Sequence, residues 1–314
     1  MAAVSELGAY LKHRRASISP ELYDIPVHTG RRVAGLRREE VAHLTGVSVA
    51  YYTRLEQGTS TNASEQVLNA LARVLLLDDD ETAHLFDLGR SAPRRRPRRP
   101  QAEHAPVAMT ELIMATPNVP ALVLGRRNDV LAWNPLGHRL LAGHLDADSP
   151  QSAATRPSAT RMLFLDPHTR AQEADWEHYA KTHVAYLRMV SGRYPDDALL
   201  TELIGELTIN SPEFARFWAS GNVRECTMGQ RTLNHPEVGR IELSYQVLTQ
   251  PLTPDIRVEF YTTSADGAGR DALTLLAGAS AGAGTSAGTR ASGDAVSSSR
   301  PNGKLGAGAA FSGV

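Results

Sequence analysis

The segment REEVAHLTGVSVAYYTRLEQG, residues 38–58, has the pattern of two short helices joined at one glycine. Two helices that cross at a steep angle need a small residue at their contact and a tight turn between them. Ala42 supplies the small side chain, and Gly46 can adopt the positive φ that ends the first helix. Ser48 is a favourable N-cap for the second helix. The spacing therefore predicts two helices that cross around a tight turn.

The second helix of this segment has two different faces. Tyr52 and Leu55 are three residues apart and point inward with Val41, so they belong to a core. The outward face carries short or hydrogen-bonding side chains that can enter a major groove and contact base edges. These outward residues are Val49, Ala50, Tyr51, Thr53, Arg54 and Gln57. We expect double-stranded DNA as the partner, although the spacing alone also fits a plain helical hairpin with a solvated face.

The segment lies in an all-helical N-terminal domain, residues 1–90. Apolar periodicity predicts further helices over residues 4–16, 65–77 and 82–89, and Ser64 is the expected N-cap of the second of these. Positive side chains slightly outnumber negative ones in the first 100 residues, and the balance is reversed in the rest of the chain. This part is therefore the better partner for a polyanion.

A basic, proline-rich linker, residues 91–107, follows. Its tract Arg94–Arg99 contains five arginines in six residues. We interpret it as a solvated spacer, and contact with the DNA backbone or minor groove is the alternative.

A second domain is predicted over residues 108–279. Short apolar runs at 121–124 and 130–133 indicate a hairpin, and Asn134 is expected to cap a helix over 135–141. Further helices are expected over 173–190, 196–207 and 212–220. Three strands then follow, near 222–230, 240–248 and 256–260. This order favours an antiparallel sheet with packed helices, an α+β class. The Gly/Ala/Ser tail, residues 280–314, is expected to be disordered.

Candidate ligand-binding residues in the second domain are mostly aromatic or apolar. His183 could anchor a ligand carboxylate at the end of an apolar pocket, or it could form a hydrogen bond in the core. The remaining candidates could line a pocket or fill a core, because a pocket wall is itself packed apolar surface. They are Trp133, Asn134, Tyr179, Leu187, Phe214, Trp218 and Tyr245.

Several function classes lack their minimum motifs. No P-loop or G-x-G-x-x-G sequence is present, and His178 and His183 are five apart, which does not suit two metal ligands on one helix face. We therefore expect no catalytic site, metal or cofactor.

The chain has no long apolar run and no secretory signal, and Cys226 is its single cysteine. We therefore expect a cytoplasmic bacterial protein at the nucleoid with no membrane contact. Cys226 could be a redox sensor, but inert burial is the favoured interpretation.

The joint pattern of both domains resembles a known family. The first 90 residues resemble lambda-repressor-like, XRE-type helix-turn-helix regulators, and residues 30–58 are similar to those members that carry an MmyB-type ligand-binding domain. The second domain agrees with that resemblance through four stretches of sequence. They are VLGRRNDVLAWNPLGHRLL (123–141), MLFLDPHTR (162–170), SPEFARFWASGNV (211–223) and HPEVGRIELSYQVL (235–248).

The resemblance implies a transcription factor with a PAS-like sensor for a small, largely apolar ligand such as a fatty acid. It places Ser48, Ala50, Tyr51, Thr53 and Arg54 at positions that contact bases and phosphates. Gln or Ser often stands where this chain has Val49 and Ala50, so specificity is expected to depend more on Tyr51, Arg54 and DNA shape.

The basic residues around the first of the two helices suit contacts with the DNA backbone. They are Arg31, Arg32, Arg37 and Arg38. A homodimer on an inverted repeat is the expected assembly. Two alternatives stay open: the second domain could serve only for dimerisation or protein docking, or it could be an enzyme with an appended DNA-binding domain.

Overall fold

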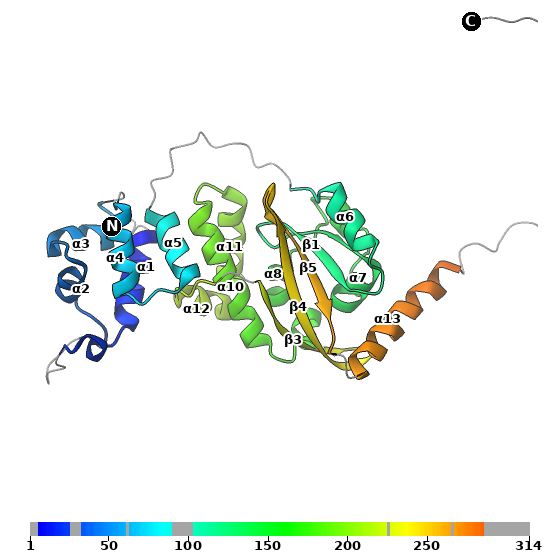
Figure 1. Ribbon diagram of the computed structural model, residues 1–314. Helices are drawn as coiled ribbons and strands as arrows, with labels where there is room; N and C mark the ends of the chain where they lie inside the picture. The colour runs from blue at the N-terminus through cyan, green and yellow to red at the C-terminus, as the bar shows by residue number, and fades with distance from the viewer. Residues whose placement is uncertain are drawn as a thin grey trace, which may run out of the picture.

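The structure is a computed structural model of the 314-residue chain. It describes residues 6–25, 33–60, 63–89, 103–224, 227–264 and 267–285, with side chains in the last helix only as far as residue 278. These residues form an all-helical N-terminal domain and a C-terminal domain built from an antiparallel sheet and helices (Figure 1). The predicted two-domain α+β architecture is confirmed.

The described part of the N-terminal domain is built from short helices around one core. Fully buried leucines from different segments, such as Leu11, Leu36, Leu55 and Leu71, meet in it. The elements are α1 (Glu6–Ser17), the 3₁₀-helix η1 (Pro20–Tyr23), α2 (Arg38–Thr45), α3 (Val49–Glu56), α4 (Glu65–Val74) and α5 (Asp79–Gly89).

The turn between α2 and α3 has the predicted geometry. Ala42 is fully buried at the helix contact, and Gly46 ends α2 with φ of +73°. The Ser48 hydroxyl accepts a hydrogen bond from the Tyr51 backbone N–H at 3.2 Å, which confirms Ser48 as the N-cap of α3. Tyr52 and Leu55 are fully buried, so the orientation of α3 is fixed by its inner face.

A buried carboxylate ties three segments of this domain together. Glu56, at the end of α3, accepts hydrogen bonds from Arg15 Nε of α1 at 2.5 Å and from Arg38 Nε of α2 at 2.6 Å. Arg15 also donates to the Leu36 carbonyl at 2.7 Å. These bonds fix α3 relative to the helices that precede it.

The C-terminal domain contains one five-stranded sheet in the order β2-β1-β5-β4-β3, and every neighbouring pair is antiparallel. In the centre, Val123 of β1 pairs with Val258 of β5, and Tyr245 of β4 pairs with Tyr261 of β5. The strands are β1 (Ala121–Leu124), β2 (Val130–Trp133), β3 (Met228–His235), β4 (Gly239–Gln250) and β5 (Thr253–Thr262).

Helices cover both faces of β1. Met109 and Ile113 of α6 pack on one face together with Val123 and Val258, whereas Leu122 points to the other face. Because both faces are covered, β1 is a continuous apolar run rather than an alternating one. The helices of this domain are α6 (Val107–Met114), α7 (Pro135–Ala142), the 3₁₀-helix η2 (Ser149–Gln151), α8 (Ala159–Leu165), α9 (Pro167–Gln172), α10 (Trp176–Arg193), α11 (Ala198–Asn210), α12 (Pro212–Ala219) and α13 (Ala268–Thr285).

The C-terminal domain differs from the sequence prediction in three places. Strand β3 begins at Met228 rather than near residue 222, because residues 211–219 complete a capped helix and Gly221, with φ of +70°, then turns the chain. Helices α6, α8, α9 and α13 were not predicted. Helix α13 continues to residue 285, past the expected end of the folded part. Residues 286–314, Cys226 and the Arg94–Arg99 tract lie outside the described residues.

Candidate functional site

Helix α3 presents an open outer face on the side of the N-terminal domain away from the C-terminal domain (Figure 1). Val49 is 48% exposed at the start of this face. Ser48, Ala50, Arg54 and Gln57 are also exposed, and Tyr51 and Thr53 are half-buried. The predicted base-reading residues thus share one surface, and the dimensions of an α-helix allow such a surface to enter a major groove.

The predicted phosphate-binding arginines have different environments. Arg38 is half-exposed but is hydrogen-bonded to Glu56, so part of its charge is already compensated. Arg37 lies at the N-cap position of α2 and pairs with Glu39 at 3.4 Å. Arg54 has no ion-pair partner among the described residues. Arg31 and Arg32 lie outside the described residues.

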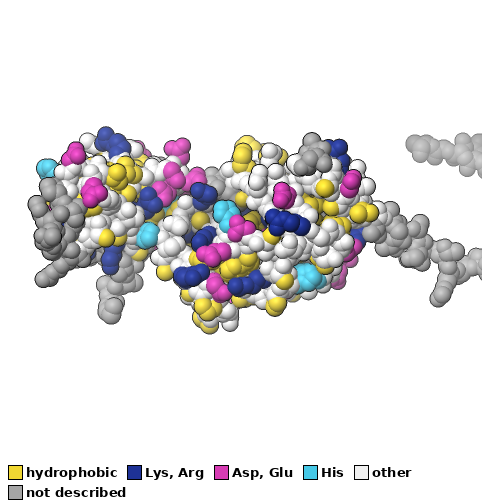
Figure 2. Space-filling view, turned by 90° about the horizontal axis from the view of Figure 1, so that it is seen from below, with side chains coloured by type: hydrophobic (Ala, Val, Ile, Leu, Met, Phe, Trp, Pro, Cys, Tyr) yellow, Lys and Arg dark blue, Asp and Glu magenta, His cyan; other side chains and the backbone are white. Residues whose placement is uncertain are grey.

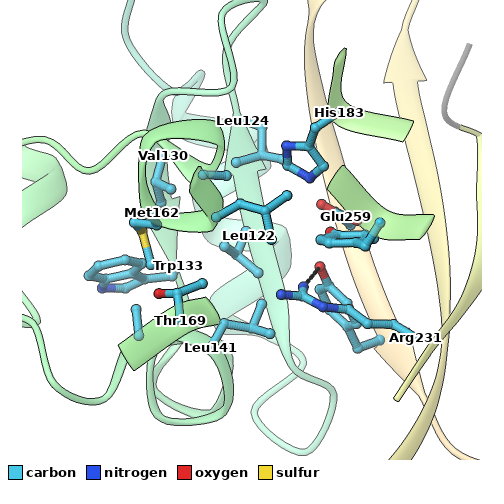
Figure 3. A pocket seen from close by; sticks show the side chains of 15 residues that line it. Leu122, Leu124, Val130, Trp133, Leu141, Met162, Thr169, His183, Arg231 and Glu259 are labelled. Atoms are coloured by element: carbon cyan, nitrogen blue, oxygen red, sulfur yellow. Dashed lines mark hydrogen bonds between the residues drawn. The ribbon is translucent and has the colours of Figure 1, made fainter. Parts of the chain in front are cut away.

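A small cavity of about 40 Å³ lies in the C-terminal domain and is lined by residues of β1, β2, β3, β5 and of α7, α8, α9 and α10. Figure 3 shows Trp133 and Met162 on one side of it and His183, Glu259 and Arg231 on the other. Its wall is formed by Leu122, Leu124, Val130, Trp133, Leu141, Ala142, Ala159, Met162, Leu163, Thr169, Tyr179, His183, Arg231, Glu259 and Tyr261. The cavity is thus apolar at one end and polar at the other.

Arg231 dominates the polar end. Its guanidinium forms a buried ion pair with Glu173, donates to the Tyr261 hydroxyl at 2.9 Å, and lies over the Tyr179 ring at 4.3 Å from the ring centre. Burial alone would lower the pKa of Arg231, but the Glu173 carboxylate outweighs this effect and holds the pKa well above its ordinary value. The pair places a fixed dipole rather than a free charge at the cavity wall.

His183 adds a neutral imidazole to the polar end. Burial, together with the nearby charges of Arg231 and Arg257, lowers the pKa of His183 to about 3. Its Nδ1 lies 3.1 Å from Thr160 Oγ1 and 3.4 Å from Asn128 Nδ2, and an amide nitrogen can only donate. Nδ1 is therefore the acceptor, and the proton of the neutral ring is on Nε2. His183 forms core hydrogen bonds and also lines the cavity.

Glu259 is the third polar group of the wall. Burial raises the pKa of the Glu259 carboxyl, although the charges of Arg257 and Arg231 oppose the shift. The polar end of the cavity therefore presents the Arg231–Glu173 ion pair, the neutral His183 ring and the Glu259 carboxyl to a ligand with an oxygen-containing group.

Trp133, Tyr179 and His183 are the predicted ligand-binding residues that line the cavity. Asn134 instead forms a structural centre: its amide donates to the carbonyls of Ile113, Thr116 and Val119 and accepts from Ala121 N and Gly137 N. Both the nitrogen and the oxygen of this fully buried amide are therefore already hydrogen-bonded within the protein. Four further candidates pack in the core or beside it without lining the cavity, namely Leu187, Phe214, Trp218 and Tyr245.

Among the described residues, no group of three or more His, Cys, Asp or Glu side chains could hold a metal ion. In the same part of the chain, none of the helices has the length and apolar character needed to cross a membrane.

Residues 105–276, more than half of the chain, match the family described as the MmyB-like transcription regulator ligand binding domain. Residues 6–85 match a helix-turn-helix domain. The chain belongs to the MmyB-like regulator family. It is a DNA-binding transcription regulator with a ligand-binding domain, and the resemblance predicted from the sequence is confirmed. A comparison with curated proteins found no match.

Most of the polar end of the cavity in this MmyB-like regulator was not predicted. Arg231 lies in β3, just past the strand predicted near 222–230, and Glu259 lies on a strand that was predicted from the apolar residues Ile256, Val258 and Phe260. A charged residue that points inward from an apolar strand is a usable signal, because burying a charge is costly unless it has a function or a partner. Leu122 and Leu124 were recognised as strand residues but not as cavity wall.

Proposed function

We propose that this chain regulates transcription by binding a specific DNA sequence through the outer face of α3, under the control of a small apolar ligand in the C-terminal domain. The observation that carries the proposal is the open α3 surface, whose inner face is locked by Tyr52, Leu55 and Glu56. A rigid helix with an exposed outer face is the element that helix-turn-helix proteins insert into the major groove.

The α3 face favours contacts of a particular kind. Val49 and Ala50 can pack on thymine methyl groups, and Arg54 can donate to guanine or to a phosphate. Arg37 and Arg38 would hold the backbone and fix the register, together with Arg31 and Arg32. Positive and negative side chains are interspersed on the face of the molecule seen in Figure 2, so that face of the C-terminal domain offers no extended basic surface for DNA.

The ligand we propose is fatty-acid-like: an apolar chain with an oxygen-containing head. The apolar wall of Leu122, Leu124 and Met162 suits the chain, and Arg231, His183 and Glu259 can receive the head. A cavity of about 40 Å³ is much smaller than such a molecule, so binding must displace wall side chains. Met162 is well suited to this because methionine side chains adapt their shape.

The assembly we propose is a cytoplasmic, nucleoid-associated homodimer on an inverted repeat whose half-sites lie about one helical turn, roughly 34 Å, apart. We divide the chain into a DNA-binding domain (1–90), a linker (91–107), a sensor domain (108–279) and a tail (280–314). We propose a regulator without catalytic activity, because the polar groups that line the cavity include no activated nucleophile.

Selection of bound duplexes from a random DNA pool tests the DNA-binding part of the proposal. We expect enrichment of one palindromic sequence at moderate salt concentration. Enrichment of no sequence above the starting pool would contradict sequence-specific binding. The symmetry of the enriched sequence also reports the assembly, because a homodimer mirrors its two-fold axis in the operator.

Mass spectrometry of the protein after gentle denaturation tests the ligand. We expect a co-purifying lipid with a chain and an oxygen-containing head. The small size of the cavity favours one competing function, a second domain that only dimerises or docks a protein. Protein free of any small molecule after expression in several hosts would support that competing function.

A further inference from the structure

Helix α10 contacts both functional parts of the chain. Tyr179 and His183, in its first half, line the cavity. Gly192 and Arg193, at its end, contact α5 of the N-terminal domain, and Figure 1 shows α5 beside α10. Nine residues separate His183 from Gly192, which is about 13 Å along a helix. A displacement of one end is therefore transmitted to the other by a short, continuous helix.

The contact between the domains centres on His84 of α5 and Gly192 of α10. The His84 ring is 2% exposed, and its edge packs on Tyr10 of α1 at 5.0 Å between ring centres. A Cβ on Gly192 would lie 2.5 Å from His84 Cε1 and 2.7 Å from its Nδ1. Glycine is unfavourable inside a helix, so this close approach is a physical reason for its presence. The ring fits against α10 only because residue 192 lacks a side chain.

Two further contacts fix the position of this junction. Arg193 Nε of α10 lies 3.4 Å from Asp87 Oδ2 of α5. The His13 ring of α1 packs on Gly221, where a Cβ would lie 2.7 Å from His13 Cδ2. Histidine rings of two helices of the N-terminal domain thus pack against glycines of the C-terminal domain. The junction is specific in shape, so a small shift of α10 cannot be absorbed without loss of contact.

Buried polar groups tie the middle of α10 to the wall of the cavity. The Tyr186 hydroxyl accepts a hydrogen bond from Arg257 of β5, and Arg257 also donates to Asn128 Oδ1. The Asn128 amide in turn contacts His183 Nδ1. Movement of the cavity wall at His183 therefore acts on α10 through these bonds as well as through the helix itself.

We propose that α10 transmits occupancy of the cavity to the DNA-binding domain, by shifting Gly192 against His84. The inference rests on the proposed function, because it requires that a ligand enters the cavity. A ligand larger than about 40 Å³ must push the wall outward, and α10 carries part of that wall. The same movement changes how α5 packs on α10, and it therefore changes the orientation of α3 relative to the C-terminal domain.

Hydrogen exchange in the full chain, measured by mass spectrometry, tests the coupling in both directions. Gly192→Ala places a methyl group against His84, and Gly205→Ala is the matched control, since its methyl group would meet nothing within 4 Å in α11. Ala142→Leu fills the cavity from α7, and Ala198→Leu makes the same change on the exposed start of α11. Coupling between two sites is reciprocal, so a substitution at the junction must change exchange at the cavity, and a substitution at the cavity must change exchange at the junction.

We expect Gly192→Ala to speed exchange at least threefold in residues 79–89 and also in the cavity segment 159–165. Ala142→Leu should speed exchange in residues 79–89 by a similar factor, and both controls should match the parent chain. Adding His84→Ala to Gly192→Ala removes the steric overlap and should restore slow exchange in residues 159–165. Circular dichroism of each variant verifies that the fold is retained.

The proposal would be overturned if the exchange rate changed only in the domain that carries the substitution. It would also be overturned if the exchange rate of residues 79–89 did not change. The affinity for the selected duplex is then measured on the same variants. Gly192→Ala should change this affinity threefold or more relative to Gly205→Ala. An unchanged affinity would refute control of DNA binding through α10. Failure of the parent chain to bind any duplex would instead refute the proposed function, whereas the exchange data would still decide whether the two sites are coupled.

Discussion

Glu56 Oε1 lies 2.5 Å from Arg15 Nε, and this buried ion pair joins the end of α3 to α1. The Glu56 side chain has no exposed surface, and the Arg15 side chain is 10% exposed. Neither group can therefore recover its hydration if the other is removed. The pair makes the position of the proposed DNA-reading helix dependent on a residue of α1, 41 positions earlier in the chain.

Glu56→Ala should lower the free energy of unfolding by about 3–5 kcal/mol, because it leaves Arg15 buried without its counter-charge. Urea denaturation followed by circular dichroism measures the loss, and the exposed Glu202→Ala serves as control. Hydrogen bonds from Arg15 and Arg38 outweigh burial and lower the pKa of the Glu56 carboxyl. Its contribution is therefore present above the unfolded pKa and is lost as the pH falls through the folded one. A loss below about 1 kcal/mol would mean that the pair adds little.

Arg54→Ala should weaken binding to the selected duplex by about 1–3 kcal/mol if its guanidinium contacts a guanine. Fluorescence anisotropy at fixed salt concentration, on the selected duplex and on a scrambled one, gives the two affinities. Arg240→Ala, an exposed arginine in β4, is a charge-matched control. An equal loss on both duplexes would assign Arg54 to a phosphate instead of a base.

Ala142→Leu should abolish binding of a fluorescent fatty acid, because the added carbon atoms occupy a cavity of only about 40 Å³. Fluorescence titration of the parent chain, of this variant and of Ala198→Leu provides the comparison. Undiminished binding to Ala142→Leu would place the fatty acid elsewhere on the protein.

Asn134→Ala should prevent stable folding of the C-terminal domain. The substitution removes a hydrogen bond from five backbone groups, of which the Ile113 and Thr116 carbonyls keep another donor, and each buried group left unpaired costs about 1–3 kcal/mol. Limited proteolysis and circular dichroism report the outcome, with the exposed Asn118→Ala as control. Native-like resistance to protease would show that water replaces the amide.

The free energy of unfolding should fall as the pH drops from about 6.5 to about 4. Burial, with the charges of Arg188 and Arg193, lowers the pKa of His84 to about 4, so between these pH values the unfolded chain takes up a proton that the folded chain does not. His84→Gln should make the pH dependence shallower than in the parent chain, and the exposed His104→Gln should not. Parallel curves for all three proteins would contradict the assigned pKa. The comparison uses thermal unfolding in matched buffers.

Local signals in the sequence predicted the helix-turn-helix segment well. Ala42, Gly46 and Ser48 each act within a few residues, so their roles as contact, turn and cap could be predicted and are confirmed by the structure. The strand predicted near 240–248 is likewise confirmed as β4, and its alternating residues Ile241, Leu243 and Tyr245 are buried.

The cavity could not be predicted in the same way, because its wall joins residues from segments far apart in the chain. Arg231 and Glu173 are 58 positions apart, and nothing local marks them as an ion pair. For Asn134, the local role could be predicted but the long-range hydrogen bonds could not. Its capping of α7 was predicted, but its hydrogen bonds to α6, to the loop after it and to the Ala121 N–H of β1 were not, and together they occupy the whole amide.

Contact of the Val49 and Ala50 alkyl groups with bases, as proposed, would have a chemical consequence for the operator. An apolar contact in the major groove senses the carbon at position 5 of a pyrimidine, and 5-methylcytosine carries the same methyl group there as thymine. At those positions the protein would accept a methylated cytosine in place of thymine, so enzymatic methylation of the genome could create binding sites as well as leave existing ones intact.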